Sequence, residues 1–345
     1  MESLLQPWNA PCLTVQKYLE FYLILLIHNS FLLNNLIPLN FQTRKIIMIY
    51  KTERCKTLRL LIPEWQSGDY DSQPSGEIYP LGARLLAFLA PQNNTSPIVE
   101  VPIEPYHQQQ RTRENGVVWQ DVIIHQLKAT QKIIDEHEPD RIITFGGTCI
   151  VSQAPFAYLN RHYNGKIGLL WIDSHPDIST PKHFDREHAM ILGNLLGKGD
   201  PYLANEVRLP FKANQVLIIG IHNYNNAYEK KIVHDLGLQT IASPDLTPDN
   251  QAILAWIRKN NFEHLAIHVD VDVLNPRSFY SQFSNNPISP QTFNNVKGEM
   301  TIPQLSKIIQ DVSLVTDIAG ITFAEHMPWD ALNLKKMMEQ FSFMK

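Results

Sequence analysis

The sequence predicts an α/β fold: a single three-layer α/β/α domain with a mostly parallel sheet. Two observations support this prediction. From residue 141 onward, short and almost continuously apolar segments alternate with longer segments that have the spacing of amphipathic helices. Such strands are typical of a parallel sheet that helices cover on both faces. Two acidic clusters also follow apolar segments directly, as expected at the carboxyl edge of a sheet of this kind.

The expected elements follow one another in the order that a parallel sheet requires. Apolar segments predict strands at 58–62, 99–101, 141–145, 167–173, 215–221, 238–242, 265–272 and 318–324. Helical spacing predicts helices at 117–136, 153–163, 186–196, 226–236, 249–260 and 302–315. In the segment 249–260, for example, Ala252, Ile253, Trp256 and Ile257 share one helical face. The stretch 276–297 is rich in Asn, Ser and Pro, so we expect a long loop that lies over the site.

Residues 1–47 are expected to lie outside this domain, which would then span 48–345. The apolar run from Phe21 to Ile27 is followed by His28 and Asn29, whereas a transmembrane helix needs about 20 predominantly apolar residues. No basic start and small-residue cleavage site accompany the run, so a signal peptide is not indicated. A weak membrane anchor remains the alternative for this segment.

The composition indicates an ordinary soluble protein. The chain is 44% hydrophobic and 19% charged with a net charge of −4, so no basic excess indicates a nucleic-acid partner. The three cysteines are too few and too scattered for a disulfide framework. We therefore expect a cytoplasmic protein that acts on a small molecule, without a nucleic-acid or membrane partner.

The two acidic clusters predict a metal site. Asp173, His175 and Asp177 follow the strand at 167–173, and Asp270 and Asp272 end the strand at 265–272. Because strand side chains alternate with period two, the members of each cluster should point the same way. Carboxylates crowded in this manner repel one another unless a cation neutralises them. Oxygen ligands with one or two imidazoles suit Mn²⁺, Mg²⁺ or Fe²⁺, and a pair of such ions favours hydrolysis.

In combination, the motifs resemble those of the ureohydrolases, the family of arginase, agmatinase and formimidoylglutamase. The family's Asp-x-His-x-Asp motif matches residues 173–177, and its Asp-x-Asp motif matches 270–272 with Asn275-Pro276 after it. Its Glu-x-x-Pro motif matches 325–328, and its Gly-Gly pair matches Gly146-Gly147. The order and spacing cover about residues 55–335, so the resemblance implies an arginase-like fold for nearly the whole chain after the first segment.

The resemblance also implies a pair of Mn²⁺ ions and their ligands. Asp173 and Asp270 would bridge the two ions. His175 and Asp272 would complete the shell of one ion, and Asp177 would bind the other. Members of the family often form trimers or hexamers, so a homo-oligomer is implied as well.

Three catalytic roles follow from the same resemblance. Asp177 would hold a hydroxide that bridges the metals and pass its proton to the leaving amine. Glu325 would clamp the guanidinium group of the substrate by a charge-assisted bidentate contact. His188 falls where the family keeps a histidine that relays protons, although a lone histidine in a helical stretch can also be incidental.

The chain departs from the family at one motif. Where the family has Gly-Gly-Asp-His-Ser, this chain has Gly146-Gly147-Thr148-Cys149-Ile150. Cys149 thus stands where a histidine would bind the ion held by Asp177, and Thr148 replaces an acidic residue that supports the shell. Cys149 could ligate as a thiolate and favour Zn²⁺, Fe²⁺ or Co²⁺. It could instead remain a buried thiol beside a weakly held ion, or mark a chain that has lost catalysis.

We therefore expect a hydrolase of a linear C–N bond in a guanidino, amidino or formimino compound, acting through a metal-bound hydroxide. Free arginine is a doubtful substrate, because Ile178-Ser179 stand where arginases favour Asn and no acidic residue follows Gly220-Ile221 closely. The main alternative is a catalytically weakened relative with a metal-binding or assembly role. A zinc deacetylase on a related fold is disfavoured, since no His-His pair occurs in the chain.

Overall fold

The computed structural model describes residues 55–65, 75–106, 112–287 and 296–329, together with residues 331 and 338. The segment 1–47, which we expect to be an extension, lies outside these residues. Within the described ranges, no helix combines the length and apolar character needed to cross a membrane.

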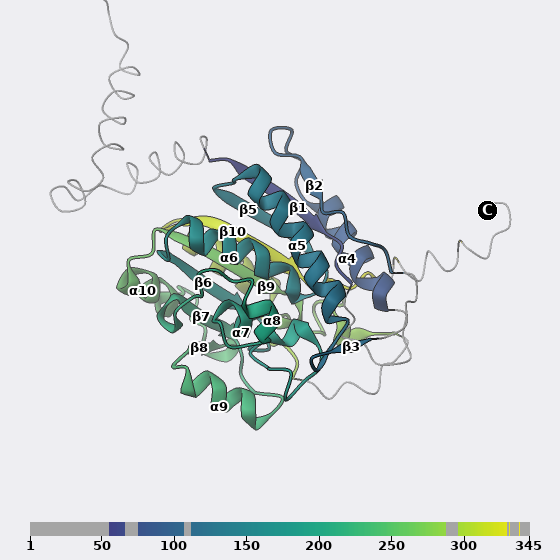
Figure 1. Cartoon of the computed structure of the whole chain (residues 1–345). Helices are drawn as coiled ribbons and strands as arrows, with labels where there is room; N and C mark the ends of the chain where they lie inside the picture. The colour runs from purple at the N-terminus through teal and green to yellow at the C-terminus, as the bar shows by residue number, and fades with distance from the viewer. Residues whose placement is uncertain are drawn as a thin grey trace, which may run out of the picture. The chain divides into compact units, whose positions relative to one another are not determined.

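An eight-stranded sheet forms the centre of the domain, and all of its neighbouring strands are parallel (Figure 1). In spatial order the strands are β2 (Ile98–Glu100), β1 (Thr57–Ile62), β5 (Arg141–Gly146), β10 (Asp317–Ala324), β9 (His264–Asp270), β6 (Ile167–Ile172), β7 (Val216–Gly220) and β8 (Gln239–Ala242). A separate antiparallel hairpin consists of β3 (Arg113–Glu114) and β4 (Val117–Val118). The predicted mostly parallel sheet is therefore confirmed.

Helices cover both faces of the sheet, and the alternation of strand side chains shows which helices cover which face. On β6, Leu169 and Trp171 pack in one core with α5 (Gln120–His137), α6 (Gln153–His162) and α7 (Ile191–Leu195). Leu170 and Ile172 pack in a second core with α10 (Gln251–Asn260) and α11 (Ile302–Ser313). Because adjacent strand residues point to opposite faces, this division gives three layers. The predicted α/β/α architecture is confirmed.

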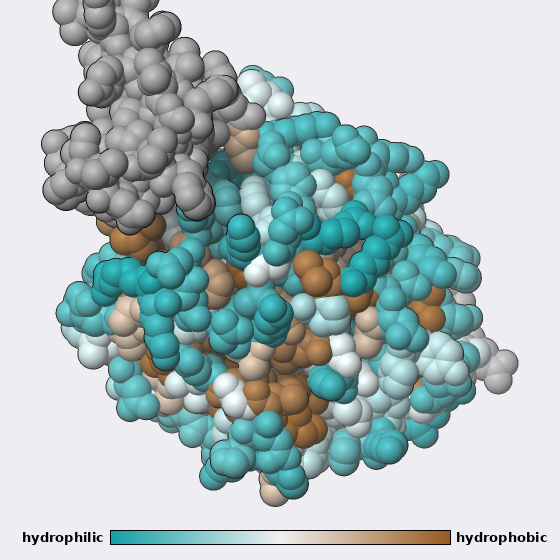
Figure 2. Space-filling view, turned by 60° about the vertical axis from the view of Figure 1, so that its left-hand side comes forward, coloured by the Kyte–Doolittle hydropathy of each residue, from teal (hydrophilic) through white to brown (hydrophobic). Residues whose placement is uncertain are grey.

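Three further helices complete the layers: α4 (Ser75–Leu89), α8 (Pro201–Ala204) and α9 (Ala227–Asp235). The helix α4 packs Ala83 and Ala87 against Leu61 and Phe145 of the sheet. On the face that Figure 2 shows, hydrophilic side chains cover most of the surface and apolar ones gather in a smaller patch. Such a surface is expected when amphipathic helices turn their apolar sides towards a sheet.

The predictions for two helices were wrong in their boundaries. The helix predicted from residue 117 begins at Gln120, because Val117 and Val118 pair with β3 instead. Asn115 and Gly116 form the tip of that hairpin with φ values of 49° and 92°, the left-handed backbone that Asn and Gly tolerate best. The predicted helix 186–196 divides into a 3₁₀ turn, η2 (Glu187–Met190), followed by the α-helix α7.

The strand predicted to reach Asp272 ends at Asp270, and η5 (Val271–Val273) follows it as a 3₁₀ turn. This turn overturns the expectation that Asp270 and Asp272 point the same way because they alternate along one strand. The helix α4 was not predicted at all. It contains Pro80 and Gly82, both of which lower helix propensity.

Candidate metal centre and active site

The register of four central strands brings the predicted site residues to one edge of the sheet. The strands β5, β10, β9 and β6 are neighbours, and Ile172 on β6 pairs with Val269 on β9. Ala324 on β10 pairs with Asp270. The residues that follow these strands therefore start from the same level at the carboxyl edge, the position where ligands bind in sheets of this type.

Asp173 and Asp270 occupy equivalent positions after β6 and at the end of β9, and each is held by a tight turn. The Asp173 Oδ1 atom accepts a hydrogen bond of 2.7 Å from the backbone N–H of His175. The Asp270 Oδ1 atom accepts one of 2.7 Å from the backbone N–H of Asp272. In both turns the Oδ1 atom of the first aspartate bonds within the turn, and its Oδ2 atom accepts a hydrogen bond from a residue outside the turn. The Oδ2 atom of Asp173 accepts from Trp171 Nε1 at 3.1 Å.

His175 and Asp272 form an ion pair across the two turns. His175 Nδ1 lies 3.1 Å from Asp272 Oδ2 and 3.6 Å from Asp173 Oδ1. Ser174 Oγ donates to the other oxygen of Asp272 at 2.8 Å. Ligand atoms of Asp173, His175 and Asp272 all lie within 4.8 Å of one another. This group contains two carboxylates and one imidazole, which agrees with one of the two predicted ion sites.

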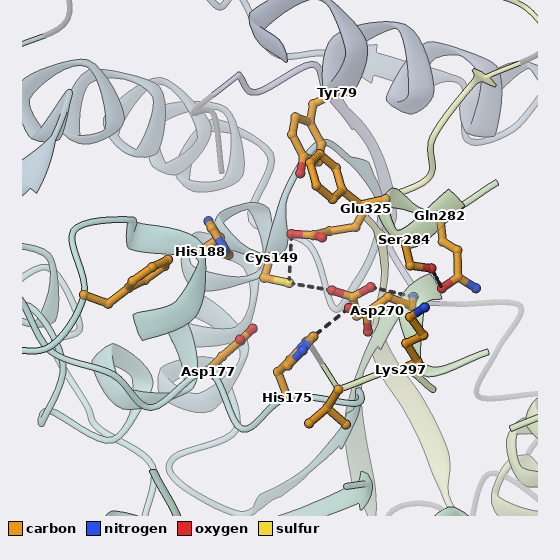
Figure 3. A pocket seen from close by; sticks show the side chains of 14 residues that line it. Tyr79, Cys149, His175, Asp177, His188, Asp270, Gln282, Ser284, Lys297 and Glu325 are labelled. Carbon is orange, nitrogen blue, oxygen red and sulfur yellow. Dashed lines mark hydrogen bonds and ion pairs between the residues drawn. The ribbon is translucent and has the colours of Figure 1, made fainter. Parts of the chain in front are cut away.

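Cys149 and Asp177 complete a second group beside the first (Figure 3). Cys149 stands in η1 (Cys149–Ser152), just after β5. Its Sγ atom donates to Asp270 Oδ2 at 3.1 Å and contacts Glu325 Oε1 at 3.8 Å. Ligand atoms of Cys149, Asp173 and Asp177 lie within 4.8 Å of one another. Asp177 Oδ2 is buried and has no hydrogen-bond partner among the described residues.

The backbone is strained where the chain presents two of these carboxylates. Asp177 has a φ of 45° and Glu325 a φ of 61°, in the left-handed region that non-glycine residues seldom adopt. The backbone N–H of Glu325 donates to the carbonyl oxygen of Gly147 at 2.7 Å, which fixes this residue after β10. Gly147 must lack a side chain, because a Cβ there would lie 2.3 Å from the Glu64 carbonyl oxygen.

Burial makes the carboxylates of the site costly to ionise. Burial raises the pKa of Asp173 to about 6. Burial and then the charge of Asp173 raise the pKa of Asp177 well above its usual value. For Asp270 and Glu325, burial and then the charge of Asp272 have the same effect on the pKa. Crowding and loss of water thus act together.

Asp272 differs from the other carboxylates because of its partner. Burial opposes ionisation, but the charge of His175 and its hydrogen bond hold the pKa of Asp272 below the ordinary value. Burial likewise opposes the charged form of His175, yet Asp272 and Asp173 raise its pKa well above normal. Among the described residues, no lysine or arginine forms an ion pair with any of the four aspartates; only histidines do.

The donor set fits divalent cations. Buried carboxylates that lack lysine and arginine partners are stabilised by a bound cation. The unpartnered, buried atoms Asp177 Oδ2 and His175 Nε2 are also what a ligand would satisfy. Burial, followed by the charge of Asp177, raises the pKa of the Cys149 thiol well above normal. A thiolate at this position therefore requires a metal ion to stabilise it.

A cavity of about 80 Å³ opens onto the two groups. It is lined by Cys149, His175, Asp177, Asp270, Asp272 and Glu325, and by eight further residues: Tyr79, Phe184, His188, Gln282, Phe283, Ser284, Val296 and Lys297. The predicted loop 276–297 thus contributes to the cavity through its described parts, as expected. Among these eight further residues, Lys297 is the one lysine, and none is an arginine.

His188 lies at the side of the cavity, on η2. Its Nδ1 atom is buried without a hydrogen-bond partner among the described residues, and its ring meets that of Phe184 at 5.9 Å. Burial and the nearby charge of Arg186 lower the pKa of His188 to about 3, so the imidazole is neutral. The structure therefore places His188 beside the other candidate residues, as Figure 3 shows.

Two residues at the site were missed from the sequence. Glu64 follows β1, and its Oε2 atom accepts from the backbone N–H and the Oγ1 atom of Thr148 at 2.9 and 2.7 Å. His268 lies on β9, and its ligand atom joins those of Cys149, Asp173 and Asp177 within 4.8 Å. The period-two rule could have found His268, because it stands two residues before Asp270 on the same strand. No local signal indicates Glu64.

Comparisons with known proteins agree with this architecture. The model of the arginase family matches residues 100–281, more than half of the chain. No curated protein sequence matches the chain significantly. Similar solved structures include the arginase of Entamoeba histolytica in complex with L-ornithine, at 14% identity and a TM-score of 0.64, covering 79% of this chain and 91% of that one.

Two further structures share the fold at similar distance. The arginase of Bacillus caldovelox has 16% identity and a TM-score of 0.62, with 79% of this chain and 91% of that chain covered. The formimidoylglutamase of Bacillus subtilis has 13% identity and a TM-score of 0.55, with 79% of each chain covered. These identities support a shared fold alone, whereas the family match covers the segment that contains both acidic clusters. The chain belongs to the arginase family, the ureohydrolases.

Proposed function

We propose that this protein is a metal-dependent hydrolase that cleaves a linear C–N bond in a small guanidino, amidino or formimino compound. The observation that carries the proposal is the convergence of Asp177, Asp270, Asp272, His175 and Glu325 on one cavity, with the buried Asp173 next to them. No lysine or arginine in the described part of the chain forms an ion pair with any of the four aspartates. A structural cluster of this kind would be expected to carry such counterions.

Two divalent ions would be held by the two groups of ligands. Asp173 belongs to both groups, His175 and Asp272 belong to one, and Asp177 belongs to the other. Asp270 adjoins them through its contact with Cys149, with which it also forms a group together with Glu325. Mn²⁺ is the ion that the family resemblance implies, while Cys149 favours Zn²⁺, Fe²⁺ or Co²⁺ at its own group. When bound, such a pair supplies an activated water and polarises the carbon to be attacked.

The side chains above the metal groups are suited to bind and orient the substrate. Glu325 faces the cavity, and its buried carboxylate would pair with an amidinium group in a bidentate contact that burial strengthens. That contact would turn the amidine carbon towards the metal groups. Asp177, with one oxygen unpartnered among the described residues, would pass a proton to the leaving amine. His188 would exchange that proton at the side of the cavity.

Lys297, one of the residues that line the cavity, suggests how the substrate is oriented. Lys297 lines the same cavity as Glu325 and would attract an anionic group at the other end of the substrate. A guanidino or formimino acid therefore fits better than a compound that is cationic at both ends. The Bacillus subtilis neighbour is a formimidoylglutamase and the Entamoeba histolytica one is an arginase. For this chain we propose the shared chemistry, with free arginine the less favoured substrate.

The test is product release by the purified full chain. The protein is stripped with a chelator, reloaded with Mn²⁺, Zn²⁺, Co²⁺ or Fe²⁺, and given guanidino acids, agmatine and formimino acids. We expect urea or formamide to form with at least one ion, and the matched variant Asp270→Asn to be inactive. Metal binding without either product from any compound would favour the alternative, a weakened relative with a metal-binding or assembly role.

Two other expectations belong with this proposal. We propose that the protein is a cytoplasmic homo-oligomer, a trimer or hexamer, and that residues 48–345 suffice for the fold. Light scattering after size exclusion tests the oligomer. A shortened chain that starts at Met48 and keeps the unfolding midpoint of the full chain would support the domain boundary.

A further inference from the structure

His268 is a buried histidine whose surroundings use only one of its two ring nitrogens. It is fully buried on β9, directly beside Trp171 on β6 in the sheet register. Its ring stacks on that of Trp171 with centroids 3.8 Å apart and planes 15° apart. The Nδ1 atom hydrogen-bonds to Ser152 Oγ at 2.8 Å. The Nε2 atom has no hydrogen-bond partner among the described residues.

The unused nitrogen faces the metal groups. His268 Nε2 lies 4.0 Å from Asp173 Oδ2, too far for a hydrogen bond. Ligand atoms of His268, Cys149, Asp173 and Asp177 all lie within 4.8 Å of one another. Metal–nitrogen, metal–oxygen and metal–sulfur bonds of about 2.0–2.3 Å allow opposite ligands to be up to about 4.5 Å apart. Small movements of the side chains would therefore close this set around one ion.

We propose that His268 is a ligand of the ion held by Cys149, Asp173 and Asp177. This inference rests on the proposed metal centre and extends it. The site would then contain one imidazole, one thiolate and two carboxylates, whereas the neighbouring group of Asp173, His175 and Asp272 has no sulfur ligand. The set with sulfur selects Zn²⁺ or Co²⁺ over Mn²⁺, so the two ions of the centre need not be the same.

The contacts around His268 are those of an oriented ligand. A metal-binding histidine usually gives its second ring nitrogen to a fixed partner, which sets the tautomer and the ring plane. Ser152 Oγ is that partner here, and its place in η1 links it to Cys149 three residues earlier. The Trp171 ring limits rotation of the imidazole, and its Nε1 atom donates to Asp173. Trp171 thus positions both His268 and Asp173.

A purely structural histidine is the competing explanation, in which the Ser152 bond and the Trp171 stack are the whole role. The two explanations differ in what happens to Nε2 when metal is added. A ligand changes its nitrogen resonance and its coupling to a paramagnetic ion, whereas a structural histidine does not. The measurement therefore has to observe the imidazole itself and not the activity of the loaded enzyme.

The experiment uses the full chain loaded with Co²⁺ or Zn²⁺. In the wild type we expect a thiolate-to-cobalt absorption band. Nitrogen resonances of the ¹⁵N-histidine-labelled zinc form should show two metal-bound imidazoles, those of His175 and His268. In His268→Asn we expect one bound imidazole and an affinity for the second equivalent of Co²⁺ that is lower by at least about tenfold. The matched control is His264→Asn on the same strand, whose histidine pairs with Asp317 at 3.1 Å; it should behave as the wild type.

The outcomes separate this inference from the proposed function. A wild type in which the imidazole of His175 binds the metal and that of His268 does not overturns the role of His268, and this result does not require any variant to fold. Unchanged cobalt affinity in His268→Asn overturns it as well, while urea or formamide release by the wild type would still support the hydrolase. Two bound imidazoles without release of either product would support His268 as a ligand and count against the hydrolase.

Discussion

Replacing Asp173 with Asn is expected to stabilise the metal-free protein at neutral pH. Asp173 is fully buried, and its pKa rises from 3.8 to about 6 because burial disfavours the charged carboxylate. Between these two values the folded state binds more protons than the unfolded state, so the free energy of unfolding falls as the pH rises. A difference of about two pKa units corresponds to about 3 kcal/mol.

The sign of this effect can be followed through the pH range. Below about pH 4 both states are protonated at Asp173, and the wild type and Asp173→Asn should have similar stability. The wild type then loses stability up to about pH 6, where the loss is complete, while the variant has no such titration. Urea unfolding followed by tryptophan fluorescence, in chelator from pH 4 to 8, measures the difference between the two proteins.

A divalent ion should reverse the order of stability. The wild type gains about 4 kcal/mol when the free ion exceeds its Kd a thousandfold, and the variant gains less because it lacks a central ligand. Asp317→Asn is the control, since Asp317 titrates with the opposite sign. Burial disfavours the charged form of Asp317, but its contacts with His264 and Arg141 lower its pKa below the ordinary value. The stability that Asp317 contributes is therefore lost as the pH falls. Parallel curves for wild type and Asp173→Asn in chelator would refute the reasoning.

Three other predictions test the cavity and the fold. Glu325→Gln should lower kcat/KM by about 10- to 100-fold through loss of a charge-assisted contact, while elemental analysis finds the metal content unchanged. Lys297→Gln should raise KM several-fold for guanidino acids and leave agmatine unaffected, which steady-state kinetics would measure. Gly82→Ala should lower the free energy of unfolding by at least about 2 kcal/mol, because its Cβ would lie 1.8 Å from the His326 carbonyl oxygen. A wild-type urea midpoint in that variant would contradict this packing.

The predictable part of the fold is the part with local periodicity. The strand β6 is a continuous apolar run and β9 is mostly apolar between its ends, so their place in a parallel sheet could be inferred from the sequence alone. The helix α4 has no comparable signal. It forms around Pro80 and Gly82 because Ala83 and Ala87 pack on Leu61 and because Gly82 allows close approach to residue 326. Tertiary packing of this kind overrides propensity and is not visible in the local pattern.

The candidate site was also predictable from the sequence only in part. The residues Asp270 and Asp272 were identified, but the expected reason was wrong, because a turn and not strand alternation brings them together. Glu64 reaches Thr148 from 84 residues away in the sequence, and His268 reaches Ser152 across 116 residues. Neither partnership has a spacing that could be read along the chain. Both contacts form only when the folded sheet brings the ends of distant strands together.

If the proposed metal centre is correct, the surroundings of residues 148 and 149 fit an adapted metal site better than a decayed one. Glu64 supplies a carboxylate beside Thr148, where the family has an acid, and burial raises its pKa to about 7 although Thr148 donates two hydrogen bonds to it. His268 brings an imidazole towards Cys149, where the family has a histidine. A metal site that had lost its role would not be expected to keep a carboxylate and an imidazole beside the two substituted positions.

This argument predicts the result of rebuilding the family motif. Thr148→Asp with Cys149→His should give no gain in Mn²⁺ affinity, measured by titration calorimetry, and should destabilise the protein. A carboxylate at 148 would face Glu64 Oε2, now 2.7 Å from Thr148 Oγ1, and burial of both side chains leaves the two charges poorly screened. Adding Glu64→Gln removes that repulsion and should restore at least about 2 kcal/mol. A large gain in Mn²⁺ affinity and turnover from the double substitution alone would instead indicate a chain whose own residues no longer support catalysis.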